Sequence, residues 1–153
     1  MLYMSNRQQH NHLKFDFFLT RKGGKNNTLT NGNQIINAND RMNWHVKGLI
    51  AQFLRRLGHD KAVDASYSPD NPLFSSENPC VISILVLAPT RRRFDAPNLY
   101  PTVKPLIDGM TDAGVWSDDN NHVIKSMTFS TSEQLSGSHE YIISITIDKF
   151  NVE

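Results

Sequence analysis

The spacing of apolar residues along the chain predicts four strands. Residues 13–20 (LKFDFFLT) and 141–148 (YIISITID) have strand composition, and the second stretch alternates between apolar and polar positions. Residues 80–88 (CVISILVLA) form a nearly continuous β-branched run, which is typical of a central strand buried on both faces. A further strand is expected near 122–130, and the polar residues 130–140 after it predict a hairpin that pairs it with the last strand.

Apolar residues at helical spacing predict a first helix in the segment before the central strand. Asn39 or Asp40 can serve as its cap, and the helix is expected to run through residues 41–58. Gly58 is expected to stop it. Residues 60–78 are then expected to form a long loop, because they contain clusters of Ser, Pro, Asp and Asn.

A second helix is predicted after the central strand. With Thr102 as N-cap, Pro105 falls in the first turn, where its missing amide hydrogen costs little. The helix is expected to run to Ala113 and to stop at Gly114.

The predicted order is therefore strand, helix, strand, helix, strand, strand. This order predicts an α+β fold in which one mixed sheet of about four strands carries two helices packed on it. A chain of 153 residues is long enough for one domain with a buried core, so we expect a single domain over residues 1–153. Residues 1–12 are polar and are expected to form a flexible tail.

Composition and charge narrow the classes of function. The formal net charge is only +1, so any affinity for nucleic acid has to come from the placement of charges and not from their sum. The single cysteine, Cys80, cannot form an internal disulfide and is expected to be a buried small apolar residue. With no charged-then-apolar leader and no apolar run of membrane-spanning length, we expect a cytosolic protein that does not enter membranes.

Candidate chemistry gathers around the second helix. Three arginines (91–93) and Asp95 follow the central strand, Lys104 lies at the start of the helix, and Asp118 and Asp119 precede the next strand. If the strands on either side are neighbours, these groups can meet at one edge of the sheet. Carboxylates are hard oxygen ligands for Mg²⁺, and lysine or arginine can stabilise charge on a phosphate.

Each of these features also has an ordinary structural interpretation. Adjacent aspartates before a strand often form a turn, and three consecutive arginines often lie on a solvated face. Lys104 and Asp108 are four residues apart on a helix, so a surface ion pair explains them equally well.

The stretch RRRFDAPNLYPTVKPLIDGMTDAGVWSDDNNHV (91–123) resembles the RusA family of phage-encoded endodeoxyribonucleases, which resolve Holliday junctions. The shared pattern begins with a basic run and an Asp-containing segment that ends in Asn-Leu. A helix follows, which carries a lysine and then Asp-Gly and ends in Ala-Gly. The pattern closes with two adjacent aspartates. Residues 39–45 (NDRMNWH) are similar to the start of the first helix in some phage members. The resemblance covers the second half of the chain well and the first half loosely.

The resemblance implies roles for individual residues. Asp95 and Asp119 would be the essential metal ligands, with Asp118 in support, and Lys104 would bind the scissile phosphate or stabilise the transition state. It also implies Mg²⁺ as the cofactor, with Mn²⁺ as a substitute. The substrate would be branched DNA such as a four-way junction, and the protein would be a homodimer whose two sites cut two strands symmetrically. A cytoplasmic protein encoded by a phage or prophage follows from the same resemblance.

The expected DNA contacts are basic and polar residues around this site. Arginines dock the backbone as bidentate phosphate ligands, and a mobile basic loop at residues 21–33 can add further contacts. The predicted set is Arg91, Arg92, Arg93, Arg41, Lys25 and Asn98.

The sequence departs from the family pattern at one position. Where the better-known pattern reads Asp-x-Asp-Asn, this chain has Asp95-Ala96-Pro97-Asn98, so Pro97 replaces an aspartate. Asn98 or Asp108 could supply the missing oxygen. Two alternatives to the nuclease therefore stay open: a junction-binding protein with weak or lost cleavage, and a structural α+β dimer whose charges form only surface ion pairs.

Overall fold

A computed structural model, which describes residues 12–151, contains one mixed sheet of four strands in the order β1-β4-β2-β3. The strands are β1 (His12–Leu19), β2 (Cys80–Leu87), β3 (Ile124–Thr131) and β4 (Tyr141–Lys149). Strand β4 is antiparallel to both β1 and β2, and β3 is parallel to β2. The α+β class and the order of elements predicted from the sequence are confirmed. The predicted tail, apart from His12, lies outside the described residues.

The predicted pairing of the last two strands as a hairpin is wrong, because β2 lies between them. Residues 132–140 cross the end of β2 instead, and the amides of Ser132 and Ser136 bond to the carbonyls of Val86 and Ala88, both at 2.9 Å. Strand β2 is central as predicted, with both of its edges paired. It is buried on one face only, contrary to the prediction, because Cys80, Ile82, Ile84 and Val86 are buried whereas Ser83 and Leu85 on the other face are exposed. Cys80 is fully buried as predicted, and burial raises the pKa of its thiol to about 12.

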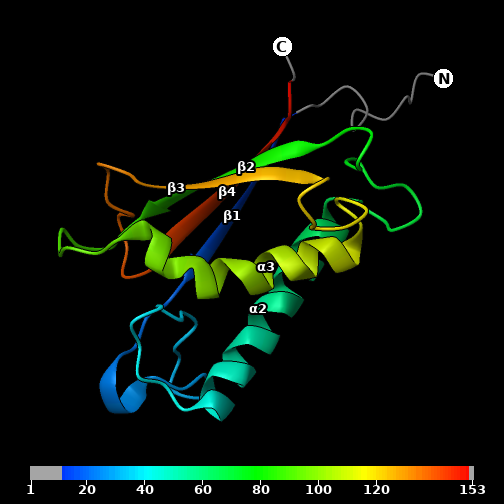
Figure 1. Cartoon of the computed structure of the whole chain (residues 1–153). Coiled ribbons are helices and arrows are strands. Elements are labelled where there is room, and N and C mark those ends of the chain that lie inside the picture. Colours follow the sequence, from blue (N-terminus) through cyan, green and yellow to red (C-terminus); the bar gives the residue numbers. More distant parts are fainter. Residues whose placement is uncertain (1–11, 152–153) are drawn as a thin grey trace.

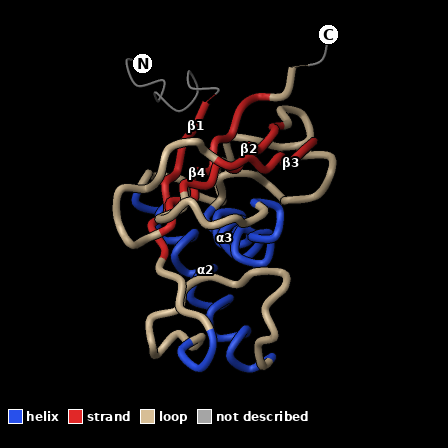
Figure 2. Tube along the Cα trace, turned by 90° about the vertical axis from the view of Figure 1, so that its left-hand side faces the viewer, coloured by secondary structure: helices blue, strands red, loops and turns tan. Residues whose placement is uncertain are grey.

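Both long helices lie on the same side of the sheet, α2 (Trp44–Asp64) and α3 (Tyr100–Ala113), as Figures 1 and 2 show from two directions. The core between the sheet and the helices is built from alternating strand residues, among them Phe15, Phe17, Ile82, Ile84, Ile143 and Ile145. Among residues 12–151, no helix has both the length and the apolar character needed to cross a membrane.

The limits of α2 differ from the prediction at both ends. The helix begins at Trp44 because the Asn43 side chain caps it, accepting a hydrogen bond from the His45 amide at 2.8 Å. At the other end it continues past Gly58 to Asp64. Gly58 is a contact point and not a stop, because a Cβ there would lie 2.2 Å from the carbonyl oxygen of Leu106 in α3.

Helix α3 also begins earlier than predicted. A short 3-10 turn, η2 (Ala96–Leu99), leads directly into it at Tyr100, which places Pro105 beyond the first turn. Thr102 is fully buried and is not the cap; its hydroxyl bonds both the amide and the carbonyl of Ile36 at 2.8 Å. Gly114 ends the helix as predicted, with the left-handed φ of 89° that glycine adopts most readily.

The close contact of the two helices generates a first prediction. A Cβ at Gly109 would lie 1.9 Å from the carbonyl oxygen of Arg55 and 2.7 Å from the amide nitrogen of His59, both backbone atoms of α2. We expect Gly109→Ala to lower the free energy of unfolding by about 3 kcal/mol, because the helices have to separate. Urea denaturation followed by circular dichroism measures this loss.

Gly48→Ala is the matched control, because a Cβ at this position in α2 would have no other atom within 4 Å. It should raise the free energy of unfolding by about 0.5–1 kcal/mol through helix propensity alone. Equal effects of the two substitutions would contradict a close helix contact.

Candidate functional site

The sheet by itself does not bring the two predicted acidic segments together. Strands β2 and β3 are neighbours, as the sequence argument required, but they run parallel. Asp95 therefore follows the end of one strand, whereas Asp119 precedes the start of the other, at the opposite end of the pair. Helix α3 runs between these two ends (Figure 1). Charged side chains meet on its flank.

Lys104 lies on this flank between two carboxylates. Its Nζ is 2.5 Å from Oδ1 of Asp108, one turn further along α3, and 2.7 Å from Oδ2 of Asp119 in the segment after the helix. Lys104 and Asp119 are two of the groups that were expected to meet at one edge of the sheet, and the structure brings these two into contact. It also confirms the alternative ion pair with Asp108, so one lysine serves both partners.

The charges of this cluster support one another. Partial burial by itself lowers the pKa of Lys104, but hydrogen bonds to Asp108 and Asp119 outweigh burial and raise the pKa above its ordinary value of 10.5. The hydrogen bond from Lys104 in turn holds the pKa of Asp119 below its ordinary value of 3.8. At neutral pH the cluster is therefore one ammonium held by carboxylates.

A second ion pair extends the cluster along α3. Arg55 of α2 donates two hydrogen bonds to Asp112, at 2.7 and 2.9 Å. The hydrogen bonds to Asp112 are the largest cause of a raised pKa of Arg55, and the negative charges of Asp108 and Asp119 raise this pKa further. Sequence reasoning assigned no role to Asp112 and considered Asp108 only as an alternative. The signal was present in the four-residue spacing of positions 104, 108 and 112, which puts them on one helix face.

The remaining predicted metal ligands are placed differently. Asp118 is exposed and supports the local turn, accepting hydrogen bonds from the Asp119 amide at 2.7 Å and from the Asn120 side chain at 3.0 Å. Asp95 is exposed at the start of η2, and its side chain makes no hydrogen bond or ion pair within residues 12–151. In the same range, no group of three or more His, Cys, Asp or Glu side chains is placed to hold a metal ion. Metal binding by Asp95, Asp118 and Asp119 stays a prediction.

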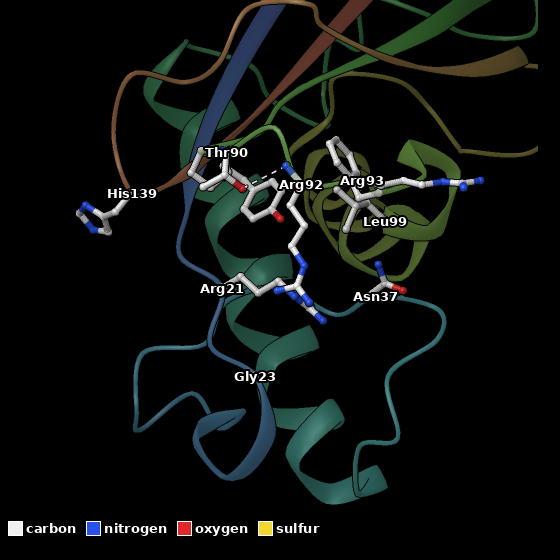
Figure 3. Close-up of a pocket in the computed structure, with 11 residues that line it drawn as sticks. Arg21, Gly23, Asn37, Thr90, Arg92, Arg93, Leu99 and His139 are labelled. Carbon is white, nitrogen blue, oxygen red and sulfur yellow. Dashed lines mark hydrogen bonds between the residues drawn. The ribbon is translucent and has the colours of Figure 1, made fainter.

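Two of the predicted arginines line a cavity near the end of β2. The cavity has a volume of about 490 Å³, and Arg92 and Arg93 line it together with Arg21, which follows β1. In Figure 3 the Arg92 side chain extends toward Arg21, whereas the Arg93 side chain points to the right, away from it. Arg91 lines a separate depression beside Thr131 and Glu133.

The other predicted DNA contacts do not line this cavity. Arg41 lines a smaller neighbouring cavity of about 220 Å³, which shares Arg21 with the first. Lys25 is exposed in the 3-10 turn η1 (Gly24–Asn26). Asn98 is half-buried, and its carbonyl accepts a hydrogen bond from the Ala38 amide at 2.7 Å.

An ion pair fixes the shared wall of the two cavities. Arg21 donates to both oxygens of Asp40, at 3.2 and 2.7 Å, and the Asn37 amide also donates to Asp40, at 2.8 Å. Sequence reasoning considered Asp40 as a helix cap and Arg21 only as part of a basic loop that could contact DNA. Their partnership is invisible in the sequence because it joins the end of β1 to a loop 19 residues further on.

Comparison with known proteins does not place the chain in a family. No family model matches it, and no curated protein sequence matches it significantly.

The Arg21–Asp40 pair generates a prediction on stability and pH. Burial raises the pKa of Asp40, but hydrogen bonds from Arg21 and Asn37 outweigh it, so the pKa lies below its ordinary value of 3.8. A lowered pKa in the folded state means that the stabilisation is complete above that ordinary value and is lost as the pH falls through the folded-state pKa. We expect Asp40→Asn to cost about 1–2 kcal/mol at pH 7, and the difference from the wild type to shrink below about pH 4.

Urea denaturation between pH 3 and pH 7 measures this difference. Asp64→Asn is the control, since Asp64 is exposed at the end of α2 and makes no ion pair within residues 12–151. Its cost should stay below about 0.5 kcal/mol at every pH. A pH-independent cost for Asp40→Asn would contradict the assigned ionisation.

Proposed function

We propose that the protein is a metal-dependent endonuclease that cuts four-way DNA junctions as a homodimer. The observation that carries the proposal is the Lys104 ammonium held between the carboxylates of Asp108 and Asp119. All three residues belong to the stretch 91–123 that resembles the RusA family. The fold supports the same assignment, because its order of elements is the one expected for a RusA-like domain.

The carboxylate pair fits a divalent cation. Two oxygen atoms, from Asp108 and Asp119, lie 2.5 and 2.7 Å from a single cationic nitrogen, so both already converge on one position of positive charge. Hard oxygen donors of this kind are what Mg²⁺ and Mn²⁺ prefer. When bound, such an ion supplies an activated water and neutralises charge on the phosphate. Asp108 would then provide the oxygen that Pro97 cannot, and Asp95 and Asp118 are the further proposed ligands.

Lys104 would act as a fixed positive charge and not as a base. Its raised pKa keeps the ammonium protonated at neutral pH, so it cannot accept a proton from water. An ammonium on a flexible side chain that is 41% exposed can exchange a carboxylate for a phosphate oxygen. That exchange would free Asp108 and Asp119 for the metal and bring the scissile phosphate to the same place.

The proposed approach of DNA follows the distribution of charge. Arg91, Arg92 and Arg93 are exposed in the loop that leads into η2 and α3, the same elements that carry Asp95 and Lys104. Arginine at such a position binds phosphates bidentately, with an affinity that falls as salt rises. Two copies related by a twofold axis would present two such sites to the two strands of a junction.

A binding protein without efficient cleavage is the second candidate, and Pro97 favours it. Pro97 lies exposed in the first turn of η2, two residues after Asp95, where the family pattern has a carboxylate. A missing ligand weakens the metal site without affecting the phosphate contacts. The two candidates therefore differ in cleavage and not in binding.

Cleavage of a labelled four-way junction is the direct test. With Mg²⁺ or Mn²⁺ we expect cuts that are absent in EDTA and on a linear duplex. Asp119→Asn should lower the rate by at least about 100-fold, because one carboxylate of the metal pair becomes neutral. Lys104→Met should lower it by a similar factor, since the ammonium that meets the phosphate is lost.

Asp64→Asn is the control for charge, because Asp64 is exposed at the end of α2. It should cut at the wild-type rate. Junction binding in EDTA without cutting in either metal would favour the second candidate. Neither binding nor cutting would reject both and leave a structural protein.

Salt dependence of junction binding tests the arginines separately. Replacing Arg91, Arg92 and Arg93 with glutamine should flatten the plot of log affinity against log salt concentration. The expected change is about 0.9 in slope for each phosphate contact that is lost. Arg56→Gln, on the exposed face of α2, should leave the slope as it is. An unchanged slope in the triple variant would remove the arginines from the DNA interface.

A further inference from the structure

The cavity lined by Arg21 and Arg92 has a composition that the proposed backbone contacts do not explain. Its charged lining residues are Arg21, Arg92 and Arg93, and no carboxylate of residues 12–151 lines it. Its remaining walls include Phe94, Leu99 and Tyr141, which are apolar or aromatic. At about 490 Å³ it is far larger than one phosphate needs and falls within the roughly 300–1,000 Å³ typical of small-molecule sites.

The cationic side of the cavity is prepared for an anion. Arg21 gives two of its five N–H donors to Asp40, which holds the guanidinium in place and leaves three donors for another partner. Arg92 makes no ion pair within residues 12–151, although its side chain extends toward Arg21 (Figure 3). Asp40 balances the charge of Arg21, so the charge left to be balanced on this side is that of Arg92, and an anion between the two guanidinium groups would balance it.

The apolar side presents aromatic rings. Phe94 and Tyr141 are half-buried and stand edge to face, with ring centres 5.9 Å apart and an interplanar angle of 89°. This perpendicular contact fixes both rings, and both still line the cavity. Flat rings beside arginines are the combination that proteins use to hold a base and its phosphate.

We propose that this cavity binds one unpaired DNA nucleotide, with its phosphate on Arg21 and Arg92 and its base against Tyr141 and Phe94. A base inside a duplex cannot enter a hollow, because it has to leave the stack first. Unstacking costs least where pairing is already interrupted, as at the centre of a four-way junction. The inference rests on the DNA-binding part of the proposed function and adds a site that recognises the branch point.

Binding of 5′-dTMP and of inorganic phosphate, each titrated into the full chain by calorimetry, tests the chemistry of the cavity. We expect 5′-dTMP to bind at least about tenfold more tightly than phosphate, because only the nucleotide uses the aromatic wall. Tyr141→Leu should remove that advantage, whereas Tyr141→Phe should keep it. Arg92→Gln should weaken both ligands by about tenfold.

Matched controls separate the cavity from its surroundings. Arg56→Gln removes the same charge from the exposed face of α2, and Tyr100→Leu removes an exposed tyrosine on α3. Both should bind 5′-dTMP as the wild type does. Thermal unfolding of each variant shows whether a loss of binding reflects a loss of the fold. Equal affinity for 5′-dTMP and phosphate would overturn the proposal.

A junction carrying 2-aminopurine at the branch point identifies the source of the nucleotide. Its fluorescence should rise when the wild type binds and should not rise with Tyr141→Leu. No rise with the wild type, despite 5′-dTMP binding, would overturn the DNA assignment and leave a site for free nucleotides. Junction cleavage without 5′-dTMP binding would reject the cavity alone. Binding of 5′-dTMP without any junction binding would reject the nuclease and leave the nucleotide chemistry standing.

Discussion

The close contact between α2 and α3 determines where the charged groups of the candidate site that lie on these two helices are placed. Gly58 and Gly109 each bring a helix against the backbone of the other, at separations that no Cβ would allow. This contact sets the axis of α3 and joins Arg55 of one helix to Asp112 of the other. Because Lys104 and Asp108 lie on the same helix, their positions follow from the same packing.

The balance of charge differs between the two ends of α3. Carboxylates gather beside Lys104 and after the helix, whereas uncompensated arginines gather before it, near the end of β2. The parallel pairing of β2 and β3 creates this separation, because the acidic and the basic segments are attached to opposite ends of the two strands. A net charge of +1 therefore conceals two regions of opposite sign.

Predictions from the sequence were correct where no long-range contact opposed the local signal. The nearly continuous apolar run of β2 predicted a central strand, and Gly114 predicted the end of α3. Predictions failed where a long-range contact outweighed a local rule. Gly58 breaks a helix by propensity, but close packing against Leu106 keeps it inside one. Thr102 is a good cap by composition, but its hydroxyl is used by the backbone of Ile36, 66 residues away.

The features of the candidate site can also be divided into those that the sequence predicts and those that only the tertiary structure sets. The sequence by itself determined the residue types, the contact of Lys104 with its helical neighbour Asp108, and the resemblance on which the function was proposed, because these depend only on spacing along the chain. Tertiary structure alone decided that β3 pairs with β2 instead of β4, that Arg21 joins Asp40, and that three arginines share one cavity with two aromatic rings. Those choices are set by how the sheet and helices bury their apolar faces together, and no stretch of the chain contains that information locally.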